Sequence, residues 1–215
     1  FIGGSEETVA QMVNRAKAVN SERVVLVGPD IASDGGGTMS AVFAAAAVAA
    51  VIAGNTDPSV PINGAELTLF GAAGKRLSDN EIDQLVRGGV TPIETVGGVS
   101  SPVRGITTKT SSGGAADTTW RELTTILIVD EVIPTIRSAL RTRFARSKNT
   151  AQSRGAIRSQ VVLELEEMKS REIVDSYGEV LVSALKSDPT VCLVEFSFTV
   201  AHGLNRIYLT AHITV

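Results

Sequence analysis

The side chains best suited to proton transfer or metal binding are scarce in this sequence. Its 215 residues include two histidines, His202 and His212, and one cysteine, Cys192. A single cysteine forms no internal disulfide and supplies no thiolate cage for a metal. No serine lies in a nucleophile-elbow motif, so nothing marks a Ser–His–Asp triad. We therefore predict no catalytic residue and no metal site, with the histidines at the bend and on the polar face of a hairpin and Cys192 in a core.

Two glycine-rich segments raise the question of phosphate binding. Gly35-Gly36-Gly37 stands between an expected strand and an expected helix, but it lacks the G-x-G-x-x-G spacing and the Lys-Ser/Thr pair of nucleotide-binding loops. In the segment 71–75 (GAAGK), Leu69 stands where a Walker motif has its first glycine, and Arg76 replaces the magnesium-binding Ser or Thr. We interpret both as turns and predict no cofactor. A small α/β nucleotide-binding enzyme remains a distant alternative.

The overall charge is close to balanced. Twenty Lys and Arg stand against 23 Asp and Glu, which gives a net charge of −3 and a pI near 5.5. This argues against a protein whose whole surface binds a polyanion. The acidic cluster Glu164, Glu166 and Glu167 has Lys169 and Arg171 close by in sequence, which is typical of a solvated helix face with modest ion pairing.

The positive charges, in contrast, are concentrated in one stretch. No acidic residue occurs between Glu131 and Glu164. The alternatives are a solvated cationic face, a docking patch for an acidic protein, and a nucleic-acid site. Aromatic residues make up only 4% of the chain, and Phe144 is expected in the core, so we favour an acidic protein partner over nucleic acid. The seven basic residues of this stretch are Arg137, Arg141, Arg143, Arg146, Lys148, Arg154 and Arg158.

The first half of the chain has the rhythm of an α/β layer with a mixed, mainly parallel sheet flanked by helices. A helix capped by Ser5, with Glu6 and Glu7 in its first turn, precedes a buried strand over 23–28. An Ala-rich helix follows over 38–53, and its apolar run of thirteen residues is too short for a bilayer, which needs about 20.

Further elements are expected before a boundary. The patterns predict strands over 66–70, 91–96 and 103–108, and a helix that a Ser78–Glu81 capping box starts and Gly88-Gly89 ends. The segment 111–116 (SSGGAA) is the best candidate boundary. We therefore expect an α/β domain over 1–116 and a second domain over 117–215.

The second half predicts a helical pair and a C-terminal β-hairpin. A Thr119–Glu122 capping box opens a long helix that Pro134 should kink or split, and Thr150 starts the next helix, with Val161 and Leu165 inward. Apolar residues then alternate over 191–200 and again over 206–215. These two segments are expected to pair around the bend at 201–205.

Several segments together resemble contractile tail sheath proteins of bacteriophages. Residues 118–168, which open with TTWRELTTILIVDEVIP, and the ending 191–215 (VCLVEFSFTVAHGLNRIYLTAHITV) resemble the C-terminal region of that family. Residues 22–30 (ERVVLVGPD) and 75–94 resemble its preceding domain. The match is spread over most of the chain and is specific as a set. The start at Phe1 is then expected to be the edge of a longer subunit.

The resemblance implies a non-enzymatic structural protein of the virion tail that is assembled in the bacterial host cytoplasm. Its expected partners are identical sheath subunits, the tail tube protein, and the baseplate and tail terminator proteins, with no direct nucleic acid and no membrane. Family arms add strands to neighbouring subunits, so the terminal hairpin is a candidate for strand exchange. The alternative is a sheath subunit of a related contractile injection system, a bacteriocin or a secretion sheath, which would contract by the same mechanism. The expected strand-exchange residues are Phe196, Phe198, Ile207, Leu209 and Ile213.

Overall fold

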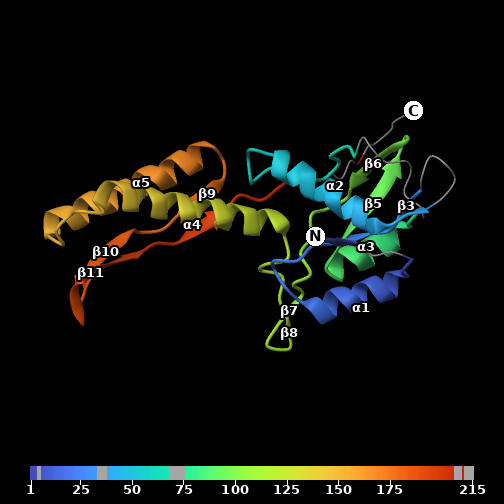
Figure 1. The fold of residues 1–215 in the computed structure, drawn as a ribbon, viewed down its shortest axis with the longest axis horizontal. Helices are drawn as coiled ribbons and strands as arrows, with labels where there is room; N and C mark the ends of the chain where they lie inside the picture. Colours follow the sequence, from blue (N-terminus) through green and yellow to red (C-terminus); the bar gives the residue numbers. More distant parts are fainter. Residues whose placement is uncertain (4–5, 33–37, 68–75, 206–209, 211–215) are drawn as a thin grey trace. The chain divides into compact units, whose positions relative to one another are not determined.

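A computed structural model describes residues 1–3, 6–32, 38–67, 76–205 and 210. The chain forms two compact units. Unit 1 comprises residues 1–56, 60–126 and 203–215, and unit 2 comprises residues 57–59 and 127–202. The predicted division at 116/117 stays a prediction. Figure 1 shows the elements of each unit along the chain.

Unit 1 is built on a mixed sheet, as the fold-class prediction requires. In the described residues its strand order is β1-β2-β5-β6, in which β1 and β5 run parallel to β2 and β6 runs antiparallel to β5. Helices α1 and α3 contact each other, and α2 packs on β1 and β2 from the other side of the sheet (Figure 1). The strands of the sheet are β1 (Ile2–Gly3), β2 (Leu26–Gly28), β5 (Val90–Val96) and β6 (Val99–Pro102), and the helices are α1 (Val9–Val19), α2 (Ala41–Gly54) and α3 (Asp79–Arg87).

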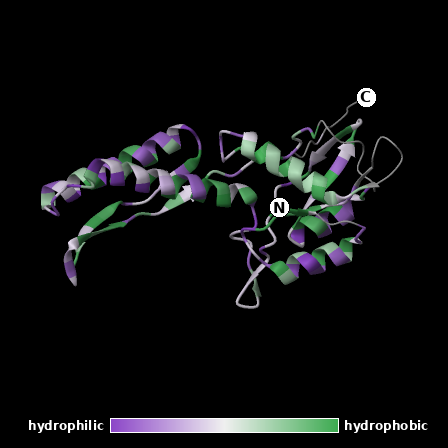
Figure 2. Cartoon of the chain, in the orientation of Figure 1, coloured by the Kyte–Doolittle hydropathy of each residue, from purple (hydrophilic) through white to green (hydrophobic). Residues whose placement is uncertain are grey.

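The helix starts follow from local hydrogen bonds. The Ser78–Glu81 capping box is confirmed at α3, and Gly88 ends that helix as predicted. Helix α1, however, is capped by Thr8 and not by Ser5, because Gln11 completes a capping box with Thr8. Glu6 and Glu7 therefore precede the helix, and the prediction that they lie in its first turn was wrong. Helix α2 is apolar on every side and mostly green in Figure 2.

One strand prediction was wrong, and a second falls mostly outside the described residues. Thr91 Oγ1 accepts a hydrogen bond from the Ile106 N–H and donates one to the Ile106 carbonyl, both at 2.9 Å. Ile106 also forms an isolated antiparallel bridge with Glu122, and no continuous strand forms over 103–108. The chain instead returns from β5 into β6 through Gly97 and Gly98, whose φ angles of 62° and 87° suit a tight hairpin turn. Of the segment 66–70, only Glu66 and Leu67 are described, and they lie outside any strand.

The candidate boundary 111–116 folds as a small hairpin. Strand β7 (Ser111–Ser112) pairs antiparallel with β8 (Ala115–Ala116) around Gly113-Gly114. The Asn20 side chain accepts hydrogen bonds from the backbone N–H groups of Thr110 and Ser111 and donates one to the Ser111 carbonyl. A similar short hairpin, β3 (Ile31–Ala32) with β4 (Thr38–Met39), precedes α2.

The start of the long helix differs from its prediction. The Thr119–Glu122 capping box is absent, because the Glu122 carboxylate binds the Arg104 guanidinium with N···O distances of 2.5 and 3.2 Å. Helix α4 (Leu123–Phe144) then runs unbroken through Pro134. The predicted split therefore does not occur, and the kink that was its alternative stays a prediction. Pro134 is exposed, so the lost backbone hydrogen bond lies on the solvent side, where water can replace it.

Unit 2 packs the helical pair onto β-strands around one core. Helix α5 (Ala151–Ser170) is capped by Thr150 as predicted, and its buried Val161 and Leu165 meet Ile128 and Val132 of α4. The strands are β9 (Val174–Tyr177), β10 (Leu181–Leu185), β11 (Asp188–Glu195) and β12 (Phe198–Val200). Strand β11 pairs with β10, and β12 pairs with β9, both antiparallel.

The Asp30 side chain joins three segments of unit 1, and replacing it tests how these segments are held together. Its side chain is 9% exposed. One carboxylate oxygen accepts the Ala41 N–H of α2 at 2.9 Å, and the other accepts the Glu6 N–H at 2.5 Å. We expect Asp30→Ala to lower the free energy of unfolding by about 2 kcal/mol, because both N–H groups lose their acceptor. Chemical denaturation measures this. The exposed Glu167→Ala serves as control, with a change within about 0.5 kcal/mol; equal losses in the two variants would contradict the prediction.

Candidate assembly surface

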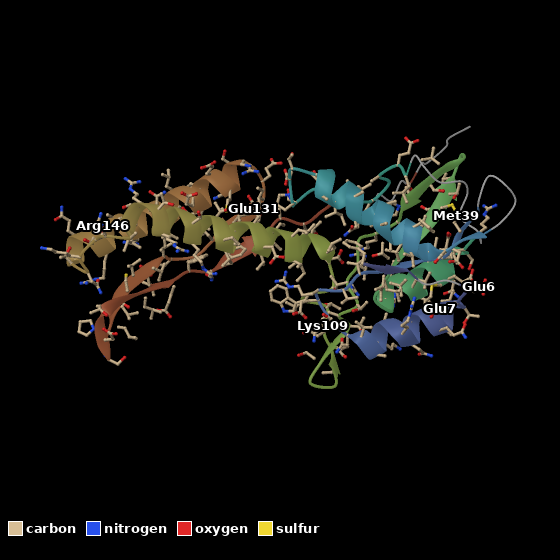
Figure 3. All side chains as sticks on the ribbon, viewed as in Figure 1. Glu6, Glu7, Met39, Lys109, Glu131 and Arg146 are labelled. Atoms are coloured by element: carbon tan, nitrogen blue, oxygen red, sulfur yellow. The ribbon has the colours of Figure 1, made fainter. Side chains whose placement is uncertain are left out.

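The seven predicted basic residues lie together at one end of the α4–α5 pair, which we call the basic end (residues 134–161). Six of the side chains are exposed and Arg154 is half-buried. Arg141 and Arg143 lie in the last turn of α4, where positive charge is favoured by the helix dipole. Figure 3 labels Arg146 just beyond the end of α4.

Three of the seven basic residues are held by neighbours. Arg143 donates to the Gln160 side-chain oxygen, and the Gln160 amide nitrogen donates to Glu164 at 2.7 Å. Arg154 donates to the Asn149 side-chain oxygen at 3.0 Å. Arg158 lies 3.7 Å from Glu179, an exposed pair of little energetic weight. These contacts hold the three side chains in place through polar neighbours.

The other four basic residues are open for an outside partner. Within the described part of the chain, they have no hydrogen bond or ion pair through their side chains. A charged group that is already hydrated and exposed costs little to keep in the free subunit and is available for pairing with an acidic surface. These four residues are Arg137, Arg141, Arg146 and Lys148.

A β-hairpin lies beside the basic end. Asn149, in the α4–α5 turn, donates from its amide nitrogen to the carbonyls of Pro189 and Val191 in β11, at 2.7 and 3.2 Å. Val182 and Val194, which are cross-strand partners, pack on the core of unit 2. The β10–β11 hairpin is thereby fixed to both the helical turn and the core.

The opposite face of the β10–β11 hairpin is open and carries mainly apolar side chains, together with Ser183 and Glu195, and we call it the outer face. Among the residues that the structure describes, neither β10 nor β11 has a second partner strand. An exposed apolar strand pair with open edges is a typical site for pairing with another chain. The outer-face side chains and their exposed fractions are Leu181 (51%), Leu185 (37%), Val191 (41%) and Leu193 (40%).

The predicted strand-exchange residues are placed only in part. Phe196 and Phe198 stack with ring centroids 6.2 Å apart and pack against the core of unit 2. Ile207, Leu209 and Ile213 lie outside the described residues, as does the expected pairing of 206–215 with 191–200. The alternation over 191–200 is confirmed, but its described partners are β10 and β9.

The outer face was not predicted from the sequence, although the residues of β10 and of the turn after it indicate a strand followed by a turn. Leu181-Val-Ser-Ala-Leu185 is a short run with four apolar residues, and the Ser187-Asp188-Pro189 segment after it is typical of a turn. The Asp188 carboxylate accepts hydrogen bonds from the Thr190 side chain and N–H, which lowers the pKa of Asp188. This local motif keeps the carboxylate charged at the hairpin turn.

The far end of the helical pair, residues 127–133 and 162–175, is acidic, and we call it the acidic end. It carries Glu131, labelled in Figure 3, and the exposed Glu166 and Glu167. The Tyr177 hydroxyl donates to Glu166, and this hydrogen bond to a carboxylate raises the pKa of Tyr177. Tyr177 thereby ties α5 to β9 at this end.

The other chemically interesting residues have ordinary surroundings. His202 is exposed, and Cys192 is half-buried on the core side of β11. His212 and both glycine-rich segments lie outside the described residues. In the part of the chain that is described, no cluster of His, Cys, Asp and Glu is suited to a metal ion. None of the described helices combines the length and the apolar character needed to cross a membrane.

Known proteins with similar sequences are tail sheath proteins. Residues 115–214 match the family described as phage tail sheath C-terminal domain. The tail sheath protein of Bacillus phage SP01 is 29% identical over 219 residues, which cover 99% of this chain and 37% of that protein. The chain therefore spans little more than a third of the length of this curated relative.

Solved structures with the same fold come from phage-like sheaths. They include the sheath tail protein of Desulfitobacterium hafniense, with a TM-score of 0.69 at 13% identity over 92% of this chain and 48% of that one. The contracted sheath of the PVC extracellular contractile injection system has a TM-score of 0.74 at 14% identity over 100% of this chain and 63% of that one. These likenesses establish the fold alone. The chain is thus similar to phage tail sheath proteins, and its residues 115–214 match the phage tail sheath C-terminal domain family.

Proposed function

We propose that this chain is a structural subunit of a contractile tail sheath, which polymerises around a tail tube and contracts to drive the tube through the host cell envelope. The observation that carries the proposal is the match of residues 115–214 to the sheath C-terminal domain family. The likeness to the PVC sheath supports a related contractile injection system as the second setting. Polymerisation and contraction of the subunits would follow the same mechanism in both settings.

The geometry of unit 2 supports an assembly role over catalysis. The outer face of the β10–β11 hairpin presents leucine and valine side chains beside open strand edges. The basic end adds four unpaired charges next to it. Such a surface is suited to apolar burial and strand addition by neighbouring subunits, with charge selecting the orientation. Strand exchange through Phe196, Phe198, Ile207, Leu209 and Ile213 remains part of the proposal.

The mechanism then needs no reacting group. Extended and contracted sheaths are two arrangements of identical subunits, and the difference in their interface free energy does the work. A few kcal/mol per subunit is of the order that shifts a two-state equilibrium decisively. Repeated over many subunits, it supplies a large total.

The proposal includes partners and a location. Identical subunits form the polymer, the tube protein lies inside it, and baseplate and terminator proteins contact its two ends. The assembled protein lies in a virion tail built in the bacterial cytoplasm. Within the chain, residues 1–116 and 117–215 act as the two sheath domains.

Electron microscopy tests this function directly. The full-length gene product, concentrated with and without its tube protein, is expected to form hollow cylinders in negative stain and to sediment as a polymer. A protein that stays monomeric in both conditions, at concentrations where related sheaths polymerise, would contradict the proposed function.

A further inference from the structure

Charge is divided along the helical pair of unit 2. The basic end, residues 134–161, has seven basic residues and no acidic one. The acidic end, residues 127–133 and 162–175, has seven acidic residues and two basic ones. Helices α4 and α5 are packed side by side, since Ile128, Val132, Val161 and Leu165 share one core. The segments 127–133 and 162–175 therefore lie at the same end of the helical pair. The net charge of unit 2 therefore changes sign from one end of its helical pair to the other.

The two ends do not neutralise each other within one subunit. Glu131 and Arg146 are separated by fifteen residues, or about 22 Å along a helix. Figure 3 shows these two side chains well apart. Charges separated by more than about 8 Å at physiological salt are largely screened from each other. In the described residues the basic end forms one ion pair, Arg158 with Glu179.

The acidic end also carries charges that the subunit leaves open. Glu167 and Asp175 are exposed, and neither has a hydrogen bond or ion pair through its side chain to any described residue. Glu164 and Glu166, in contrast, are engaged by Gln160 and Tyr177. The basic end thus offers exposed, unpaired positive charges, and the acidic end offers exposed, unpaired carboxylates and a net negative charge, with Lys169 and Arg171 as its two basic residues. Opposite net charges of this kind suit complementary docking surfaces.

We propose that the basic end of one subunit docks on the acidic end of a second copy of this chain. The contact joins two different surfaces, so it is heterologous and continues from copy to copy, as rings and helical polymers require. The inference rests on the proposed function, since it names the contact that a polymer of this chain would use. An acidic tube protein is the competing occupant of the basic end.

Charge reversal at each end separates these possibilities in the full-length protein. The basic-end variant is Arg141→Glu with Arg146→Glu, which leaves the Arg143–Gln160 contact intact. The acidic-end variant is Glu167→Lys with Asp175→Lys, and the third variant combines all four changes. The control is Lys17→Glu with Arg87→Glu, two exposed residues in the last turns of α1 and α3, with the same charge change as the basic-end variant. Circular dichroism and thermal melts check that each variant is folded.

Sedimented polymer and co-sedimented tube protein are measured for every variant. We expect each single-end reversal to lower the polymer yield about tenfold and the combined variant to return to within about twofold of wild type, because opposite charges again face each other. A combined variant no better than the single reversals would overturn the proposal. The proposal would also be overturned if the acidic-end variant gave the polymer yield of the control and the basic-end variant lost only its co-sedimented tube protein. A wild-type protein that forms no polymer would overturn the proposed function itself and this contact with it.

Discussion

Replacing Leu181 and Leu193 together with serine is expected to raise the concentration needed for polymerisation about a hundredfold, since burying the two side chains contributes about 3 kcal/mol. Both leucines lie on the outer face of the β10–β11 hairpin and are about half exposed. They make little contact with the core of unit 2, so the folded subunit loses little stability. Their apolar area is gained only when a neighbour covers it.

Sedimentation at a series of protein concentrations measures this effect. The matched control is Val96→Ser with Val99→Ser, two exposed apolar residues on the β5–β6 hairpin of unit 1. It is expected to change the critical concentration by less than about threefold. If the outer-face variant polymerises like this control while remaining folded, the outer face is not an assembly surface.

Leu165→Ala is expected to lower the free energy of unfolding of unit 2 by about 3 kcal/mol. Leu165 is fully buried between the helical pair and the strands, in one cluster with Ile128, Val161 and Ile173. Truncation removes its transfer free energy and leaves a cavity that packed helices fill poorly. Since the free energy of unfolding of a whole domain is only about 5–15 kcal/mol, a loss of this size affects assembly as well.

The same helix supplies the control for this substitution. Leu163, two residues away on α5, is 58% exposed, so Leu163→Ala removes the same atoms with little loss of burial. Urea denaturation followed by circular dichroism should give a loss below about 0.5 kcal/mol for this control. Losses of similar size for Leu163→Ala and Leu165→Ala would contradict the packing described for unit 2.

Local signals in the chain predicted several elements correctly. The Ser78–Glu81 capping box and the Thr150 cap mark the starts of α3 and α5, because the donor and acceptor lie within one helical turn. The inward positions Val161 and Leu165 follow from the 3.6-residue period. The alternation over 191–200 likewise holds residue by residue. Each of these patterns depends on neighbours in sequence.

Errors arose where a distant residue competes with a local pattern. Glu122 has the spacing of a capping residue, but Arg104, eighteen residues earlier, binds its carboxylate instead. The Thr91 side chain bonds the backbone of Ile106, which forms a single bridge with Glu122 where a strand was expected. Pro134 was expected to kink or split its helix, but it lies on the exposed side of α4 and does not split it. Neither the binding partners Arg104 and Thr91 nor the exposed position of Pro134 can be recognised from the spacing of residues in the sequence.

The candidate assembly surface divides in the same way. The run of seven basic residues without an acidic one can be read directly from residues 132–163. The sequence also shows that the chain has a single cysteine, which supplies no thiolate cage for a metal. Which of those charges are engaged is a matter of three-dimensional contacts, as Arg143 and Arg154 show. The partner of the strand at 191–195 is β10, which exposes a leucine-rich face that no spacing rule selected. Strand pairing and ion pairing join residues that the chain brings together only on folding, so side-chain type and local period are set by sequence, while the partner of each group follows from the packed fold.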